Sequence, residues 1–182
     1  MALVVDASVG LKWVLQEPDS HLAEALVRIE ADLIVPDFWL HEVTNILWLQ
    51  VRKKLFTPYE AREGLPLLRA QVEPTPTAEV NLHDVFLDIG LAVNHSTNDT
   101  RYLAFVVAMG VNAVVVADGP FVRAMQTHPD STLSATVLPL DAWAGRAAMS
   151  YEHRLPKVPA VRVGCSSIPR YRLRMSRLLG RK

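Results

Sequence analysis

The chain of 182 residues has a single cysteine, Cys165. An internal disulfide and a cysteine-based metal site are therefore excluded, which is typical of proteins of a reducing cytosol. No N-terminal leader is expected, because Asp6 interrupts the first apolar run. The longest apolar stretch, residues 102–117, is shorter than the ~20 residues that a bilayer requires. We therefore expect a cytoplasmic protein without a membrane-spanning segment.

The formal net charge is zero, but the two ends of the chain differ in charge. Residues 1–150 carry ten Lys or Arg and eighteen Asp or Glu, whereas residues 151–182 carry nine and one. This contrast predicts an acidic folded domain over 1–148 and a basic, disordered extension over 149–182. Arginines interleaved with Tyr171 in the extension are a composition found in RNA-binding arms. A contact of the extension with the acidic domain, or no function at all, is the alternative.

Short runs of strand-forming residues alternate with segments of helical periodicity. The continuous apolar runs at residues 3–5, 33–35 and 113–117 are typical of buried strands of a parallel sheet. Further extended segments are expected at 135–138 and, at a sheet edge because of its prolines, at 73–77. The intervening helices are expected after Ser8 and over 20–31, 38–55, 58–72, 79–94, 98–109 and 119–127. The pattern predicts an α/β fold, a three-layer sandwich with a short parallel sheet flanked by helices.

Several local signals refine this expectation. Asp19 or Ser20 is placed to cap the second helix, and Thr57 precedes a proline at the first position of another. Trp39 and Trp48 are expected in the core or at an interface rather than in a base-stacking platform.

Four acidic residues stand where the local pattern changes. Asp6 and Asp118 each follow a buried strand, and Asp99 begins a helix. Glu42 lies one turn into the long helix, among apolar neighbours. Taken singly, each acid has a structural explanation as a turn residue, a partner of a helix dipole or a solvated side chain. Together they are expected to meet, because strand ends and helix starts converge on one crevice of a parallel sheet.

Carboxylates held close together repel one another, and their pKa values rise unless a cation neutralises them. A set of oxygen ligands without Cys or His suits Mg²⁺, or Mn²⁺. Such an ion typically binds phosphate and activates water for hydrolysis. The six histidines have no metal-ligand spacing, and we expect them to take no part. These residue types therefore indicate a Mg²⁺ site that acts on phosphate esters.

Four segments of the chain resemble the motifs of the PIN-domain ribonucleases, and most closely those of the VapC toxins of toxin–antitoxin systems. They are Val4-Val-Asp-Ala-Ser-Val-Gly-Leu-Lys-Trp13, Glu42-Val-Thr-Asn-Ile-Leu47, Asp99-Thr-Arg-Tyr-Leu-Ala104 and Val114-Val-Val-Ala-Asp118. The resemblance covers about residues 1–141, with the motifs in the family's order. It departs at Val116, where the family usually has a hydroxyl residue, and at Thr100, where alanine is common.

The resemblance implies a Mg²⁺-dependent endoribonuclease that leaves 5′-phosphate and 3′-hydroxyl ends. Asp6, Glu42, Asp99 and Asp118 would be the catalytic, metal-binding acids, directly or through water. Ser8 and Asn45 would orient a carboxylate or a water, although a helix N-cap and a polar helix residue are their alternatives.

Phosphate contacts and partners complete this expectation. Three cations near the motifs, Lys12, Arg101 and Arg123, are candidates for RNA-phosphate contacts, with solvated surface charge as the alternative. The resemblance also implies a homodimer, held inactive by a cognate antitoxin whose arginine enters the acidic crevice. The apolar residues of the helices spanning 38–72 are the candidate dimer surface.

Other functions are open. One is a PIN-fold module that binds RNA or a partner without cutting it, for which Val116 is the supporting feature. Another is a different Mg²⁺ phosphoesterase, such as a phosphatase of the haloacid dehalogenase type, although that class needs a second Asp where this chain has Ser8. A dinucleotide-dependent dehydrogenase is disfavoured, because no G-x-G-x-x-G follows the first strand.

Overall fold

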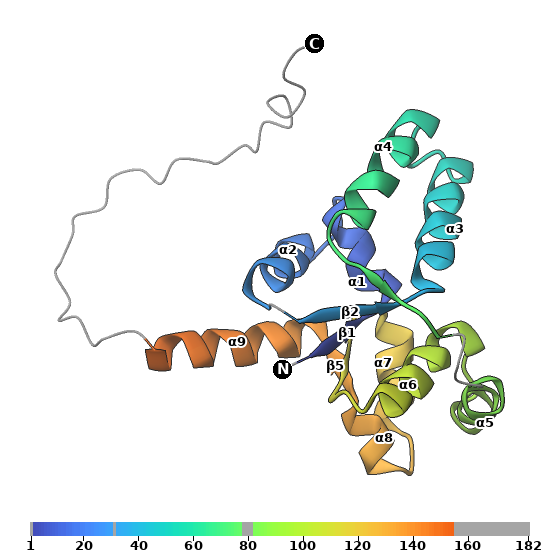
Figure 1. Cartoon of the computed structure of the whole chain (residues 1–182), viewed down its shortest axis with the longest axis vertical. Coiled ribbons are helices and arrows are strands. Elements are labelled where there is room, and N and C mark those ends of the chain that lie inside the picture. Colours follow the sequence, from blue (N-terminus) through green and yellow to red (C-terminus); the bar gives the residue numbers. More distant parts are fainter. Residues whose placement is uncertain (1, 31, 78–81, 155–182) are drawn as a thin grey trace, which may run out of the picture.

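Five short strands form one sheet at the centre of the chain, and each neighbouring pair is parallel (Figure 1). The computed structural model describes residues 2–30, 32–77 and 82–154. The order across the sheet is β3-β2-β1-β4-β5. The strands are β1 (Leu3–Val5), β2 (Leu33–Pro36), β3 (Pro74–Thr75), β4 (Val114–Val116) and β5 (Val137–Pro139). The parallel sheet and its proline-containing edge strand β3 are as predicted.

The central strands β1 and β4 are buried along their whole length. They pair in register, with Val4 opposite Val114 and Val5 opposite Val115. Helices cover both faces of the sheet, so neither face of these strands meets water. This burial on both faces explains why the two strands are apolar at every position.

The helices form the outer layers of a three-layer α/β sandwich, which confirms the predicted fold class. In Figure 1, α1 to α4 lie on one side of the sheet and α5 to α8 on the other. The first group comprises α1 (Ala7–Gly10), the 3₁₀ helix η1 (Leu11–Trp13), α2 (Ser20–Ile29), α3 (Trp39–Arg52) and α4 (Pro58–Arg69). The second comprises α5 (His83–Val93), α6 (Thr97–Met109), α7 (Gly119–Gln126) and α8 (Ser131–Ala135). Within the described ranges, none of the helices is both long and apolar enough to cross a bilayer.

The strands β1 and β4 are neighbours whose following segments leave toward opposite faces. The chain passes from β1 into α1 and α2 on one side, and from β4 into α7 on the other (Figure 1). Open α/β sheets form a ligand crevice at this kind of topological switch point, beyond the carboxyl ends of the strands. Asp6 and Asp118 are the residues that follow these two strands.

The first helix is shorter than the sequence pattern predicts. It begins at Ala7, is capped by Asp6 and gives way to η1 after Gly10. Trp39 of α3, fully buried as the sequence led us to expect, packs directly against Gly10. Trp48, by contrast, is 52% exposed.

The two predicted helix caps have different outcomes. Asp19 occupies the N-cap position of α2, as expected, but it has a left-handed conformation (φ 66°) and its side chain accepts no capping hydrogen bond. Ser20 Oγ instead donates to the Leu15 carbonyl (2.9 Å) and accepts from the Glu17 amide (3.0 Å), which closes the preceding loop. Thr57 caps α4 as predicted, in a reciprocal capping box with Glu60.

Two helices near the C-terminal end were not predicted. One is the short α8, and the other is α9 (Leu140–Arg154), which packs against α2 and the β5 edge of the sheet. Trp143 of α9 is buried, and its Nε1 donates to Glu30 Oε1 at 2.9 Å. The predicted domain boundary at residue 148 falls within α9, which continues to Arg154. The rest of the predicted basic extension, 155–182, lies outside the described residues.

Candidate functional site

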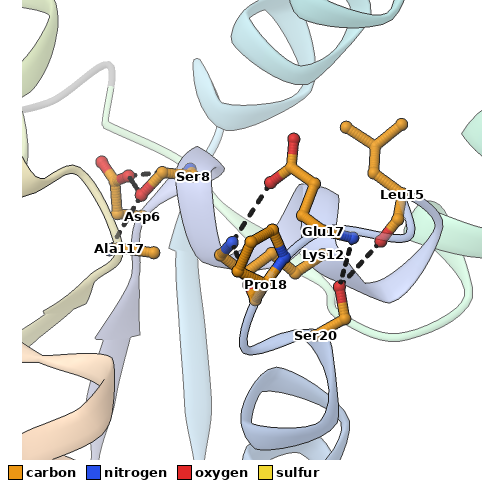
Figure 2. A network of polar contacts seen from close by, with 8 residues as sticks. All are labelled: Asp6, Ser8, Lys12, Leu15, Glu17, Pro18, Ser20 and Ala117. Carbon is orange, nitrogen blue, oxygen red and sulfur yellow. Dashed lines mark hydrogen bonds and ion pairs between the residues drawn. The ribbon is translucent and has the colours of Figure 1, made fainter. Parts of the chain in front are cut away.

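Asp6 lies at the end of β1 with its side chain 4% exposed. Its Oδ1 accepts two hydrogen bonds from Ser8, one from the amide (2.8 Å) and one from the hydroxyl. The same hydroxyl accepts from the Ala117 amide at 3.0 Å, as Figure 2 shows. Ser8 therefore joins the ends of β1 and β4 and orients the Asp6 carboxylate. Of its two predicted roles, the helix N-cap is wrong, because that position belongs to Asp6.

Asp118 follows β4 and caps α7. Its Oδ1 accepts from the Phe121 amide at 2.7 Å, so the direction of α7 holds this carboxylate at the strand end. The predicted placement of the acid at the junction of strand and helix is confirmed.

Glu42 reaches the site from the first turn of α3. Its Oε2 accepts from Arg101 Nη2 (2.9 Å) and from the Tyr102 hydroxyl (2.7 Å), both on α6. The Arg101 guanidinium also lies 4.1 Å from the centre of the Phe38 ring. In the sequence Tyr102 belongs to the apolar stretch 102–117, and its buried hydroxyl is the feature that this pattern did not reveal.

Asp99 lies in the first turn of α6, where Ser96 is the cap. Its Oδ2 is 2.9 Å from His95 Nδ1 in an ion-pair contact. Nδ1 is buried, and within the described structure this contact is outside the regular geometry of a hydrogen bond. Although the histidines are expected to take no part in the chemistry, His95 contacts one of the four acids. Its position four residues before Asp99 was the available signal.

These four carboxylates act on one another through space, and we call them the acidic site. The pKa of Asp6 is raised to about 7: burial is the largest cause, the charges of Glu42 and then Asp99 add to it, and the Ser8 hydrogen bonds oppose it. The pKa of Asp99 is raised to about 6, chiefly by burial; His95 opposes this shift, while the charges of Asp118 and Glu42 contribute to it. Burial and the charges of Asp6 and Glu42 hold the pKa of Tyr102 well above its usual value. The structure therefore brings the four predicted acids within electrostatic reach.

The donor chemistry of the acidic site fits a divalent cation. Within the described residues, each of the four acids engages its protein partners through one carboxylate oxygen: Asp6 Oδ1, Glu42 Oε2, Asp99 Oδ2 and Asp118 Oδ1. The second oxygen of each accepts no hydrogen bond from the described residues, and hard oxygen donors suit Mg²⁺. As they stand, however, no three His, Cys, Asp or Glu side chains among residues 2–30, 32–77 and 82–154 form a ready metal-ligand group. The contacts of Glu42 with Arg101 and of Asp99 with His95 give these two acids other partners.

Other predicted residues lie outside the acidic site. Lys12 Nζ bonds to Glu17 Oε2 (3.1 Å) and to the Pro18 carbonyl (2.8 Å), so its charge is engaged by its own loop (Figure 2). Asn45 is exposed on α3, and its side chain forms no hydrogen bond with the described part of the chain. Arg123 is exposed on α7, and Arg101 alone of the three predicted cations contacts one of the acids.

The fold and its switch point define an α/β protein with an all-parallel sheet in three layers. No family model matches the chain, and no curated protein matches it. Among solved structures, the fold is similar to the crystal structure of PAE2754 from Pyrobaculum aerophilum. The likeness has a TM-score of 0.59, covers 82% of this chain and 90% of that chain, and comes with 15% sequence identity. At this identity it establishes the fold.

Proposed function

We propose that this chain is a Mg²⁺-dependent endoribonuclease, a hydrolase of RNA phosphodiester bonds. The observation that carries the proposal is the acidic site: four carboxylates from separate segments, at a switch point, with the pKa values of Asp6 and Asp99 raised by burial and by neighbouring acids. A divalent cation offsets this repulsion. Asp6, Glu42, Asp99 and Asp118 would hold it, and Mn²⁺ is the alternative ion.

In the proposed reaction, the metal ion and the residues around it have different roles. When bound, Mg²⁺ supplies charge that binds a phosphate oxygen and lowers the pKa of a water. Ser8 keeps Asp6 in one orientation, and Phe121 does so for Asp118 through its amide. The carboxylates hold the attacking water and take up its proton.

RNA binding needs positive charge at the rim of this acidic site. Residues 1–150 carry eight more acidic than basic residues, which repels a polyanion. Arg101 is fixed beside Glu42 and over Phe38, and Arg123 is exposed on α7. We assign both to RNA phosphates flanking the bond that is cut.

The test is RNA cleavage with Mg²⁺, with EDTA, and in the variants Asp6→Asn and Asp99→Asn. We expect EDTA to abolish cleavage and each variant to reduce it at least about a hundredfold, since each loses a carboxylate ligand. Glu63→Gln, which changes an exposed acid of α4, is the matched control and should cut like the wild type. Variants that cut at the wild-type rate would contradict the proposal.

A non-catalytic RNA- or partner-binding module is the second candidate. Val116 favours it, because this residue is 1% exposed in the core and offers no hydroxyl near Asp118. RNA binding without Mg²⁺-dependent cleavage would support the module, and cleavage of simple phosphomonoesters but not of RNA would support a different Mg²⁺ phosphoesterase.

We propose further that the nuclease is the toxin of a type II toxin–antitoxin pair and acts in the cytoplasm. The support is the motif resemblance and an acidic site suited to an arginine from an antitoxin, since Arg–carboxylate pairs are strong and directional. A small reading frame directly upstream, whose product co-purifies with this chain and inhibits it, is the expected finding. Without such a partner the nuclease proposal stands and the toxin proposal falls.

A homodimer is the proposed assembly. Large apolar side chains are exposed on and between α3 and α4: Trp48 (52%), Leu55 (68%) and Tyr59 (66%). Light scattering should give twice the mass of the chain, and Trp48→Glu should shift the protein toward the monomer because it places a charge in the contact. A monomeric wild type would contradict the dimer.

A further inference from the structure

We propose that His95 is a positioning residue of the acidic site, which binds one oxygen of Asp99 and so directs the other toward the metal. This inference rests on the proposed function. It concerns a residue whose spacing in the sequence gave it no part in the chemistry.

The contact between His95 and Asp99 is short and sheltered. Nδ1 lies 2.9 Å from Oδ2, and the two side chains are only 19% and 21% exposed. An interaction shielded from water in this way is stronger than the same pair at a surface. The contact takes Oδ2, so the carboxylate that begins α6 is left with Oδ1 for a ligand.

The imidazole is itself held in place by α7. Its ring packs on Phe121, with the ring centres 5.1 Å apart and the planes inclined by 50°. Phe121 is 1% exposed, and its amide is the donor to Asp118 Oδ1. One buried residue thus supports two acids, Asp118 through its backbone and Asp99 through the ring of His95.

The backbone behind His95 is equally constrained. Asn94 ends α5 in a left-handed conformation (φ 50°) and turns the chain toward α6. A Cβ on Gly90 would lie 3.2 Å from the His95 carbonyl oxygen and 3.3 Å from the Thr97 methyl group. The turn therefore lies tightly against α5, which fixes the backbone from which the His95 side chain reaches Asp99.

Two variants test the effect of the His95 nitrogen separately from the effect of its ring. His95→Phe keeps an aromatic ring against Phe121 but removes Nδ1. His95→Asn keeps a nitrogen donor at a position comparable to Nδ1 but removes the ring. A pure packing role predicts that Asn is the worse replacement in every measurement, whereas a positioning role predicts that Phe is worse for metal binding.

The experiment is Mn²⁺ binding to the full chain by electron paramagnetic resonance, with thermal unfolding and RNA cleavage on the same samples. We expect His95→Phe to weaken Mn²⁺ binding about tenfold or more, the usual effect of losing a residue that orients a ligand. His95→Asn should stay within about threefold of the wild type, even though it unfolds at a lower temperature. His21→Phe, at an exposed histidine of α2, is the control and should bind like the wild type.

The outcomes distinguish this inference from the proposed function. If the wild type binds Mn²⁺ and cuts RNA but His95→Phe does so equally well, the positioning role is overturned and the nuclease stands. If Mn²⁺ affinity follows thermal stability through both variants, His95 acts by packing and the inference is also overturned. A wild type that neither binds Mn²⁺ nor cuts RNA would overturn both proposals.

Discussion

Burial affects the chemistry of Asp6 more than any neighbouring charge. Its side chain is 4% exposed, and burial is the largest cause of a pKa near 7, with Glu42 next. The hydrogen bonds from Ser8 oppose the shift because they favour the ionised carboxylate. Near neutral pH the ion-free protein is therefore a mixture of protonated and ionised Asp6, and a bound cation would favour the ionised form.

The stability of the metal-free protein should fall as the pH rises from about 5 to about 8. The pKa of Asp6 is higher in the folded chain (about 7) than its ordinary value of 3.8, so in this window the folded state binds the extra proton. At 1.36 kcal/mol for each pKa unit, Asp6 accounts for a loss of about 3 kcal/mol across the window. Asp6→Asn should remove this part of the pH dependence, as measured by urea unfolding in EDTA at both pH values. A variant with the wild-type pH dependence would contradict the assigned pKa.

Ser8→Ala should destabilise the fold by about 1–2 kcal/mol, because the Ala117 amide and the Asp6 carboxylate each lose a partner. It should also raise the pKa of Asp6 further and, under the proposed function, weaken Mg²⁺ binding about tenfold. Denaturant unfolding and Mn²⁺ titration check these effects. Ser8→Thr, which retains a hydroxyl, is the control and should keep most of the affinity.

At this scale the sequence predicts the acids better than their partners. Asp6, Asp99 and Asp118 occur where a strand ends or a helix starts, and local patterns mark such places. His95 and Phe121 lie within four residues of Asp99 and Asp118, so these two contacts are local. Tyr102, by contrast, reaches Glu42 across 60 positions of sequence, because the fold brings α6 close to α3. That packing is a property of the tertiary fold, and periodicity along one helix cannot reveal it.

At the scale of elements, α1 and α3 approach each other closely. A Cβ on Gly10 would lie 2.2 Å from Trp39 Cζ2, a distance too short for two carbon atoms that are not bonded to each other. The indole is fully buried and has no room to withdraw. The helix after Asp6 breaks near this crossing, which is why apolar spacing in the sequence predicts a longer helix than the structure has. Likewise, α9 was missed because contacts with α2 and β5, rather than a continuous apolar stripe, hold it in place.

Gly10→Ala should destabilise the protein by about 2–3 kcal/mol, since the added methyl group overpacks a full core. Its matched control is Gly145→Ala in α9, where a Cβ would meet no atom within 4 Å. That change should stabilise the protein by about 0.5–1 kcal/mol, because alanine favours the helix. Chemical denaturation of both variants gives the comparison. A neutral Gly10→Ala would show that α1 and α3 are not so closely packed.

For the molecule as a whole, charge is divided between an acidic folded part and a basic end. Residues 155–182 lie outside the described structure and contain eight Lys or Arg with no acid. Composition predicts a basic extension that begins at residue 149. Because α9 continues to Arg154, such an extension can begin only at residue 155.

A chain that ends at Arg154 should bind RNA about tenfold more weakly at low salt than the full chain, because it loses phosphate-neutralising charges. The difference should shrink as salt rises, with a smaller slope of log affinity against log salt for the shortened chain. Filter binding over a salt series measures both quantities. Equal affinity and equal slopes would remove the extension from RNA binding and leave the acidic site unaffected.

The pairing of β1 with β4 also affects how the protein is made. Val5 lies opposite Val115, and the Ser8 hydroxyl accepts from the Ala117 amide across 109 positions of sequence. A nascent chain presents Asp6 early, but the strand that completes its surroundings leaves the ribosome only after more than a hundred residues have been added. At about 5–20 residues per second, several seconds pass before the two can meet. Under the proposed function, an unfinished chain cannot attack RNA near the ribosome that is synthesising it.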